Sequence, residues 1–145
     1  MAKVVLDTNI VLDYLSAGRP CHAEASSLLE GLIECDVVPV VPAGCLKDTY
    51  YILCRHYHNE PLVRERLDAF RRVVEVQPLT NEMLDAAFSS DEPDLEDAMV
   101  RATAELLGAK AIITRDVAAY RGSSVPAMDA VTCCQSSLLV GHAWA

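Results

Sequence analysis

The sequence predicts an α/β fold with a central parallel sheet of about four to five strands and helices on both faces. Short apolar runs alternate along the chain with longer segments in which apolar residues recur at helical spacing. Hairpin signals such as Asn-Gly, which would join antiparallel strands, do not occur. Strands that alternate with helices in this way pair in parallel.

The first half of the chain contains two strand-like runs, each followed by helix-like segments. Strands are predicted at 3–6 and 36–41, and helices near 9–16, 21–34, 43–57 and 60–73. In the predicted helix at 43–57, four apolar residues lie on one stripe, which indicates the side that packs on the rest of the protein. They are Leu46, Tyr50, Leu53 and Tyr57.

The second half repeats the alternation. Its predicted elements are a strand at 73–76, a helix near 81–89, a helix at 95–107, strands at 111–114 and 125–128, and a tail helix. Gly108 is expected to close the 95–107 helix, because glycine adopts the left-handed conformation that ends many helices.

Length and composition predict a single domain over residues 1–145, since 52% of the residues are hydrophobic and can fill one core. No apolar stretch reaches the ~18 residues of a membrane span, and the amino terminus lacks a signal-peptide pattern. We therefore expect a cytoplasmic protein with no membrane association, whose six cysteines are reduced thiols in apolar surroundings. A net charge of −9 argues against general nucleic-acid binding unless basic residues cluster or a metal ion intervenes.

Two buried strands are predicted to end on aspartates. Asp7 follows the 3–6 strand directly, and Asp116 follows "AIIT" in the same manner. The carboxyl ends of parallel strands face one crevice, so these two carboxylates are expected to converge. A local alternative is that Asp7, Thr8 or Asn9 only caps the helix that follows.

Three further acids have both a local and a functional interpretation. Asp94 and Asp97 share the first turn of the 95–107 helix, where Asp94 can cap the helix and Asp97 can pair with Arg101. Asp48 borders the apolar stripe of its helix and could simply face solvent. Clustered carboxylates repel one another unless a cation lies among them, and carboxylates alone suit Mg²⁺ or Mn²⁺ better than zinc. Acids gathered at one sheet edge therefore predict a divalent-metal pocket.

Four segments carry a resemblance to the PIN domain family, which includes domains like the amino terminus of PilT. "LDTN" at 6–9, the acid in "LKDTYYIL", "DLEDAMVRATA" and "TRD" occur in the order and spacing of that family, over roughly residues 3–130. The resemblance implies a metal-dependent ribonuclease, and many bacterial members are VapC-type toxins held by an antitoxin. Two departures stand out: the family usually has Glu in place of Asp48, and the tail lacks the proline-and-acid start of the last helix.

By this resemblance Asp7, Asp48, Asp97 and Asp116 are the catalytic acids, and Asp7, Asp97 and Asp116 bind the metal. The residues expected to orient the site are Thr8, Asn9, Asp94 and Thr114. Arg115 is expected to hold an RNA phosphate; the same role is open for Arg64, Arg66, Arg71 and Arg72, which could instead be a solvated helix face.

The expected function is a Mg²⁺- or Mn²⁺-dependent endoribonuclease, the toxin of a toxin–antitoxin pair. We expect a homodimer built on the apolar helices at 21–34 and 46–57, although these residues may belong to the core instead. The alternative is a catalytically weakened module that binds RNA or a protein partner. A phosphatase with Asp7 as nucleophile would require a second aspartate where this chain has Asn9.

Overall fold

The computed structural model describes residues 1–139 and centres on one sheet. Five strands pair in parallel in the order β3-β2-β1-β4-β5. Their bounds are Lys3–Leu6 (β1), Val38–Pro42 (β2), Glu75–Gln77 (β3), Ala111–Ile113 (β4) and Ala127–Met128 (β5). The predicted α/β class and the all-parallel pairing are confirmed.

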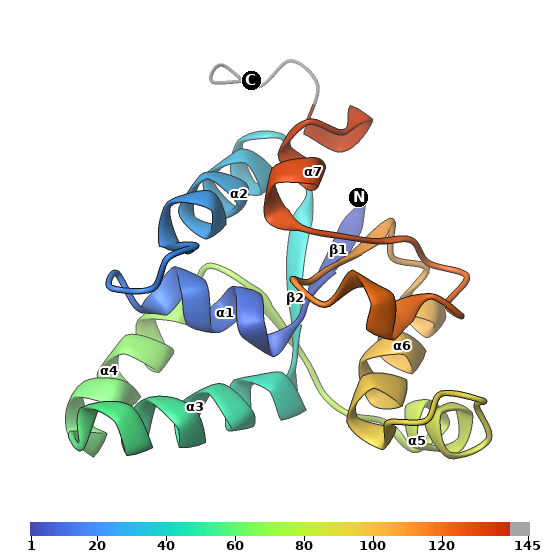
Figure 1. Cartoon of the computed structure of the whole chain (residues 1–145), viewed down its shortest axis with the longest axis horizontal. Helices are drawn as coiled ribbons and strands as arrows, with labels where there is room; N and C mark the ends of the chain where they lie inside the picture. The colour runs from blue at the N-terminus through green and yellow to red at the C-terminus, as the bar shows by residue number, and fades with distance from the viewer. Residues whose placement is uncertain (140–145) are drawn as a thin grey trace.

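Helices cover both faces of the sheet (Figure 1). One side carries α5 and α6, and the other carries α1, α2, α3 and α4. The bounds are Thr8–Leu15 (α1), His22–Glu34 (α2), Ala43–Tyr57 (α3), Glu60–Phe70 (α4), Asn81–Phe88 (α5), Leu95–Leu107 (α6) and Ala130–Cys134 (α7), with 3-10 turns at Val117–Tyr120 (η1) and Ser137–Leu139 (η2). Among residues 1–139, no helix is long and apolar enough to cross a membrane.

Strand β1 occupies the middle of the sheet and of the core. Val5 pairs with Val40 on β2 and with Ile112 on β4, and all three side chains are fully buried. Residues buried on both faces form near-continuous apolar runs, which is why the strands are short and rich in Val and Ile. The register also places the residues after β1 beside those after β4, where the predicted acids lie.

Three sequence predictions differ from the structure. The helix predicted over 60–73 ends at Phe70, the last buried residue of α4, and a tightened turn follows, so β3 begins at Glu75. On α3, Leu53 is buried, but Tyr50 and Tyr57 are 36% and 40% exposed and lie outside the core. The 3-10 turn η1 after β4 was not predicted, and it carries Tyr120 into the interior.

Three other predictions match the structure more closely. Helix α6 has the predicted bounds, and Gly108 ends it with φ of +63°. All six cysteines are free thiols, of which Cys45, Cys133 and Cys134 are buried and the others are half-buried. The predicted tail helix corresponds to α7, and the last part of the predicted tail lies outside the described residues.

Candidate metal site at the carboxyl edge of the sheet

Asp7 stands at the carboxyl end of β1, next to the end of β4. Its backbone N–H donates to the carbonyl of Ile113 at 3.0 Å, which continues the β1–β4 pairing by one residue. The carboxylate Oδ1 accepts from the backbone N–H of Thr8 at 2.8 Å, so Asp7 also caps α1. The local interpretation of Asp7 is confirmed, and capping leaves room for a second role, because it uses one lone pair of a group that has about four.

The other oxygen of Asp7 accepts two hydroxyl donors. Thr114 Oγ1 donates to Oδ2 at 3.0 Å, and the Tyr120 hydroxyl donates to the same atom at 2.9 Å. Both donor side chains are buried, at 0% and 2% exposure. Oδ2 is thus occupied, and the remaining acceptor capacity of the carboxylate is on Oδ1.

Asn9 and Thr114 join the segment after β1 to the segment after β4. Asn9 Nδ2 donates to Thr114 Oγ1 at 3.2 Å, and Asn9 Oδ1 accepts from the backbone N–H of Arg115 at 3.0 Å. The backbone N–H of Asp116 donates to Thr114 Oγ1 at 3.0 Å. These contacts fix the position of Asp116 relative to Asp7, as two strand-end acids of one site require.

Asp97 is brought to the same edge by the amino-terminal turn of α6. Asp94 caps this helix through a 3.0 Å hydrogen bond from the Asp97 backbone N–H to its Oδ1. Burial, together with the negative charges of Asp94, Asp7, Glu92 and Asp116, raises the pKa of the Asp97 carboxyl from 3.8 to about 6. Asp97 therefore lies within the electrostatic reach of the acids at both strand ends.

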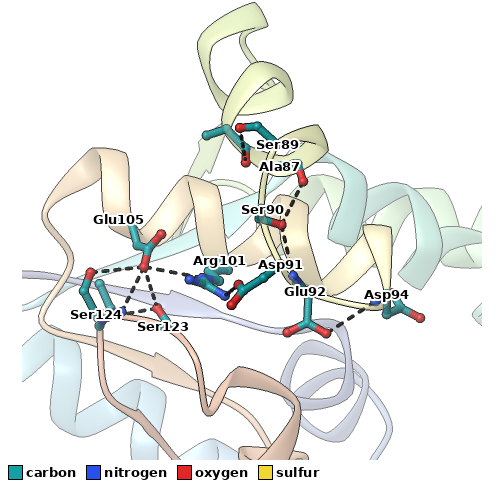
Figure 2. Close-up of polar contacts among 12 residues, drawn as sticks. Ala87, Ser89, Ser90, Asp91, Glu92, Asp94, Arg101, Glu105, Ser123 and Ser124 are labelled. Carbon is teal, nitrogen blue, oxygen red and sulfur yellow. Dashed lines mark hydrogen bonds and ion pairs between the residues drawn. The ribbon is translucent and has the colours of Figure 1, made fainter.

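Arg101 does not neutralise this cluster, although it follows Asp97 by one helical turn. Its Nη1 lies 3.1 Å from Asp91 Oδ1, and its Nε lies 3.5 Å from Glu105 Oε2 (Figure 2). Glu105 in turn accepts from the backbone N–H of Ser124 at 2.9 Å. The predicted alternative pairing of Asp97 with Arg101 is wrong, because the arginine pairs with Asp91 of the preceding loop and with Glu105 of its own helix.

Asp48 stands apart from the other acids. Its side chain is 37% exposed and forms an ion pair with Lys47 at 3.6 Å. Cys45, one turn earlier on α3, is buried, and burial together with the charges of Asp7 and Asp48 raises the pKa of its thiol to about 12. The Cys45 thiol thus lies within electrostatic reach of both acids, while the Asp48 carboxylate meets solvent as the local interpretation predicted.

The structure places Arg115 in an ion pair that sequence reasoning missed. Its Nε lies 2.7 Å from Oδ2 of Asp13, a carboxylate of α1 that is only 2% exposed. Arg19 Nε lies 2.8 Å from the other oxygen of the same carboxylate. The other arginines considered for RNA are exposed, and three of them pair within their own helix or at its end: Arg64 with Glu60, and Arg71 and Arg72 with Asp68.

Sequence reasoning also missed Tyr120. A signal was present in "TRDVAAY", where an aromatic residue with a polar end follows Asp116 by four positions. For Asp13, the signal was a carboxylate inside the apolar run "IVLDYL" of α1. A buried carboxylate requires a partner, so this residue predicts a buried ion pair.

The chemistry of the donor set fits a hard divalent cation. Asp7, Asp97 and Asp116 offer only carboxylate oxygens, which Mg²⁺ and Mn²⁺ prefer. Within residues 1–139, no three His, Cys, Asp or Glu side chains lie in an arrangement that by itself holds a metal ion.

The chain is thus a parallel α/β domain with a candidate cation site, which consists of acids at the carboxyl edge of the sheet. The chain belongs to the PIN domain family, because the family's sequence model matches residues 3–118. PIN domains are typically metal-dependent nucleases. No protein among those with curated descriptions matches this chain.

Solved structures of VapC toxins share the fold. The VapC20 toxin of Mycobacterium tuberculosis, which cleaves the sarcin–ricin loop, is 21% identical with a TM-score of 0.61 over 75% of this chain and 86% of its own. A toxin–antitoxin complex from Klebsiella pneumoniae is 20% identical with a TM-score of 0.65 over 88% and 97%. VapBC2 of Rickettsia felis, bound to a DNA fragment of its promoter, is 11% identical with a TM-score of 0.67 over 88% and 98%.

Proposed function

We propose that this protein is a Mg²⁺- or Mn²⁺-dependent endoribonuclease that acts in the cytoplasm as the toxin of a toxin–antitoxin pair. The observation that carries this proposal is the setting of Asp97. Its carboxyl is influenced by Asp7, Asp94 and Asp116, while the arginine one turn further along α6 is bonded to other carboxylates. A cluster with this uncompensated negative charge binds a cation readily, because the cation relieves the repulsion.

The roles of the residues follow from their positions. Asp7, Asp97 and Asp116 would hold the metal, and Asp48 would act through a bridging water, since it is paired with Lys47 and further from the cluster. A bound divalent cation lowers the pKa of a water molecule and offsets the charge that develops on the phosphate. A carboxylate of the cluster accepts the proton of the attacking water.

The orienting residues act on Asp7 and on the segment that carries Asp116. Thr8, Thr114 and Tyr120 fix the Asp7 carboxylate, and Asn9 binds the 114–116 segment to α1. Asp94 fixes the first turn of α6, which carries Asp97. These contacts restrain the Asp7 carboxylate and the backbone that carries Asp97 and Asp116 before any cation binds, which reduces the reorganisation that catalysis would otherwise require.

The partners of the proposed toxin are an RNA substrate, an antitoxin and a second copy of the chain. Apolar side chains remain exposed on two helices, with Ile33 of α2 at 50% and Tyr51 of α3 at 59%. We expect protein contacts on these two helices, because a contiguous exposed apolar patch is typical of an interface. The Klebsiella relative was solved as a toxin–antitoxin complex, which supports an antitoxin for this chain as well.

A second candidate is a module that binds RNA or a protein without cutting. The position of Asp48 favours it, because the family's usual Glu would reach further toward the site than an aspartate that pairs with Lys47.

The test is cleavage of single-stranded RNA by the purified protein, with Mg²⁺, with Mn²⁺ and with chelator. We expect cutting that stops with chelator and is abolished in Asp7→Asn and in Asp97→Asn. Asp85→Asn, which removes an exposed acid of α5, is the matched control and should cut normally. RNA binding without metal-dependent cutting would favour the non-catalytic module, and robust cutting by either site variant would refute the assigned acids.

A further inference from the structure

Two arginines from distant segments share one buried carboxylate. Asp13 lies on α1 and is 2% exposed, Arg19 lies in the turn after α1, and Arg115 follows β4. The Nε atoms of Arg19 and Arg115 lie 2.8 Å and 2.7 Å from the two oxygens of Asp13, and Nη2 of Arg115 donates to Oδ1 at 3.4 Å.

The charges at this three-residue cluster do not balance. One carboxylate offsets one of the two guanidinium groups, so a unit of positive charge remains. The side chains of Arg19 and Arg115 are 35% and 42% exposed, whereas Asp13 is buried beneath them. Each guanidinium carries five N–H donors, and the bonds to Asp13 use only part of this number. Donors in a fixed fork suit a phosphate, which accepts two parallel hydrogen bonds.

The cluster is adjacent to the proposed metal site. Arg115 lies between Thr114 and Asp116, and its backbone N–H donates to Asn9 Oδ1 at 3.0 Å. The excess positive charge of the two guanidinium groups is therefore carried in part by the residue next to Asp116, an acid of the site. In a chain of net charge −9, a local excess of positive charge at this place can offset the repulsion between the acidic edge and an RNA backbone.

A second pair of arginines on one carboxylate provides a comparison. Arg71 and Arg72 both contact Asp68, but all three lie within five consecutive residues at the end of α4, and Asp68 is 46% exposed. That arrangement is explained by helical neighbours alone. The Asp13 cluster instead joins residues separated by 102 positions, and it buries its carboxylate.

We propose that Arg19 and Arg115, held side by side by Asp13, contact a phosphate of single-stranded RNA that flanks the cleaved bond. This inference rests on the proposed function, because it assumes that RNA lies across the acidic edge. Asp13 is a positioning residue that orders the two donors before RNA binds. Arg19 is the informative residue, since its removal leaves a balanced Asp13–Arg115 pair and a fold that should remain intact.

The experiment measures binding of a fluorescent single-stranded RNA to the Asp97→Asn protein in Mg²⁺, by anisotropy over a range of KCl concentrations. A phosphate contact contributes about 0.7 to the slope of log Kd against log salt on single strands. We expect Arg19→Ala to reduce this slope by about 0.7 and to weaken binding by roughly threefold to fivefold, as for an exposed charge pair. Arg19→Lys should keep the slope, and Arg72→Ala should change neither quantity.

Two outcomes overturn the inference. An unchanged slope in Arg19→Ala, with or without a lower Tm, would mean that the cluster only stabilises the fold. If neither Asp97→Asn nor the wild type bound RNA, RNA would be excluded as the ligand of the two arginines. Failure of the wild type to cut RNA would refute the proposed activity but not this contact, because the slope is measured without cleavage.

Discussion

The Tyr120 hydroxyl donates a 2.9 Å hydrogen bond to Oδ2 of Asp7, across 113 positions of the sequence. The phenol is buried at 2% exposure, and burial together with the charge of Asp7 raises its pKa, so it remains protonated and a donor. A protonated donor beside a carboxylate fixes the direction of that carboxylate. With Thr114 on the same oxygen, the free acceptor position of Asp7 is on Oδ1.

Tyr120→Phe removes only this hydroxyl and keeps the ring. We expect kcat/KM for RNA to fall about tenfold or more, the effect typical of residues that orient metal ligands, and the Tm increase caused by Mn²⁺ to shrink. Tyr50→Phe is the matched control, because it removes a 2.6 Å phenol–carboxylate hydrogen bond to Glu60 on the exposed side of α3. Equal losses in the two variants, or none in Tyr120→Phe, would exclude this role for Tyr120.

Asp97 makes the metal-free protein less stable as pH rises. Its pKa is raised in the folded state from 3.8 to about 6, so its favourable contribution is complete below 3.8 and is lost as pH increases through 6. Asp97→Asn should therefore be more stable than the wild type at pH 7.5 but not at pH 3.5, by on the order of 1 kcal/mol after solvent screening.

Urea unfolding of both proteins with EDTA at the two pH values tests this difference. Other titrating groups cancel, since the two proteins share them. A constant difference in the free energy of unfolding between pH 3.5 and 7.5 would contradict the raised pKa.

A divalent cation should stabilise the folded protein. Binding to the folded state alone adds about 2.7 kcal/mol at a hundredfold excess over Kd. We expect Mn²⁺ to raise the Tm at pH 7.5 and to do so much less at pH 5, because the proton on Asp97 must leave before the cation binds. The increase should be absent in Asp7→Asn; an equal increase there would show that the ion binds elsewhere.

Asp48 distinguishes the enzyme from the non-catalytic module. If its carboxylate acts through a water molecule, Asp48→Glu brings the group closer and should maintain or raise kcat/KM, while Asp48→Ala should lower it. Lys47→Ala is a useful companion, since it removes the 3.6 Å ion pair and should not abolish cutting. Full activity in Asp48→Ala would leave a centre of three acids, and a large loss in Asp48→Glu would refute the bridging water.

Elements defined by their own residues were predictable from the sequence. Helix α6 was correct at both ends because Asp94 caps it and Gly108 terminates it, and both signals are local. Strand β3 was displaced, because only its pairing with β2 decides where this edge strand lies. The apolar stripe of α3 was partly wrong because α4 leaves Tyr50 exposed to bond with Glu60.

The candidate site was likewise predictable from the sequence only in part. The strand-end position of Asp7 beside Thr114 followed from the geometry of a parallel sheet. Asp97 and Glu105 both lie four positions from Arg101, so spacing did not decide which of them it pairs with. The contacts of Tyr120 with Asp7 and of Arg115 with Asp13 join segments more than a hundred positions apart. Local spacing could not reveal them, because each alternative partner was equally compatible with the sequence.

The order of the segments also bears on the synthesis of this protein. Asp7 directly follows β1, whereas Thr114, Asp116 and Tyr120 follow β4. More than a hundred residues separate β1 from its β4 neighbour, and until β4 has been made the carboxylate of Asp7 has only its capping contact. A chain interrupted before β4 would carry Asp7 without the groups that orient it, so the proposed activity requires β4 and η1 to have been made.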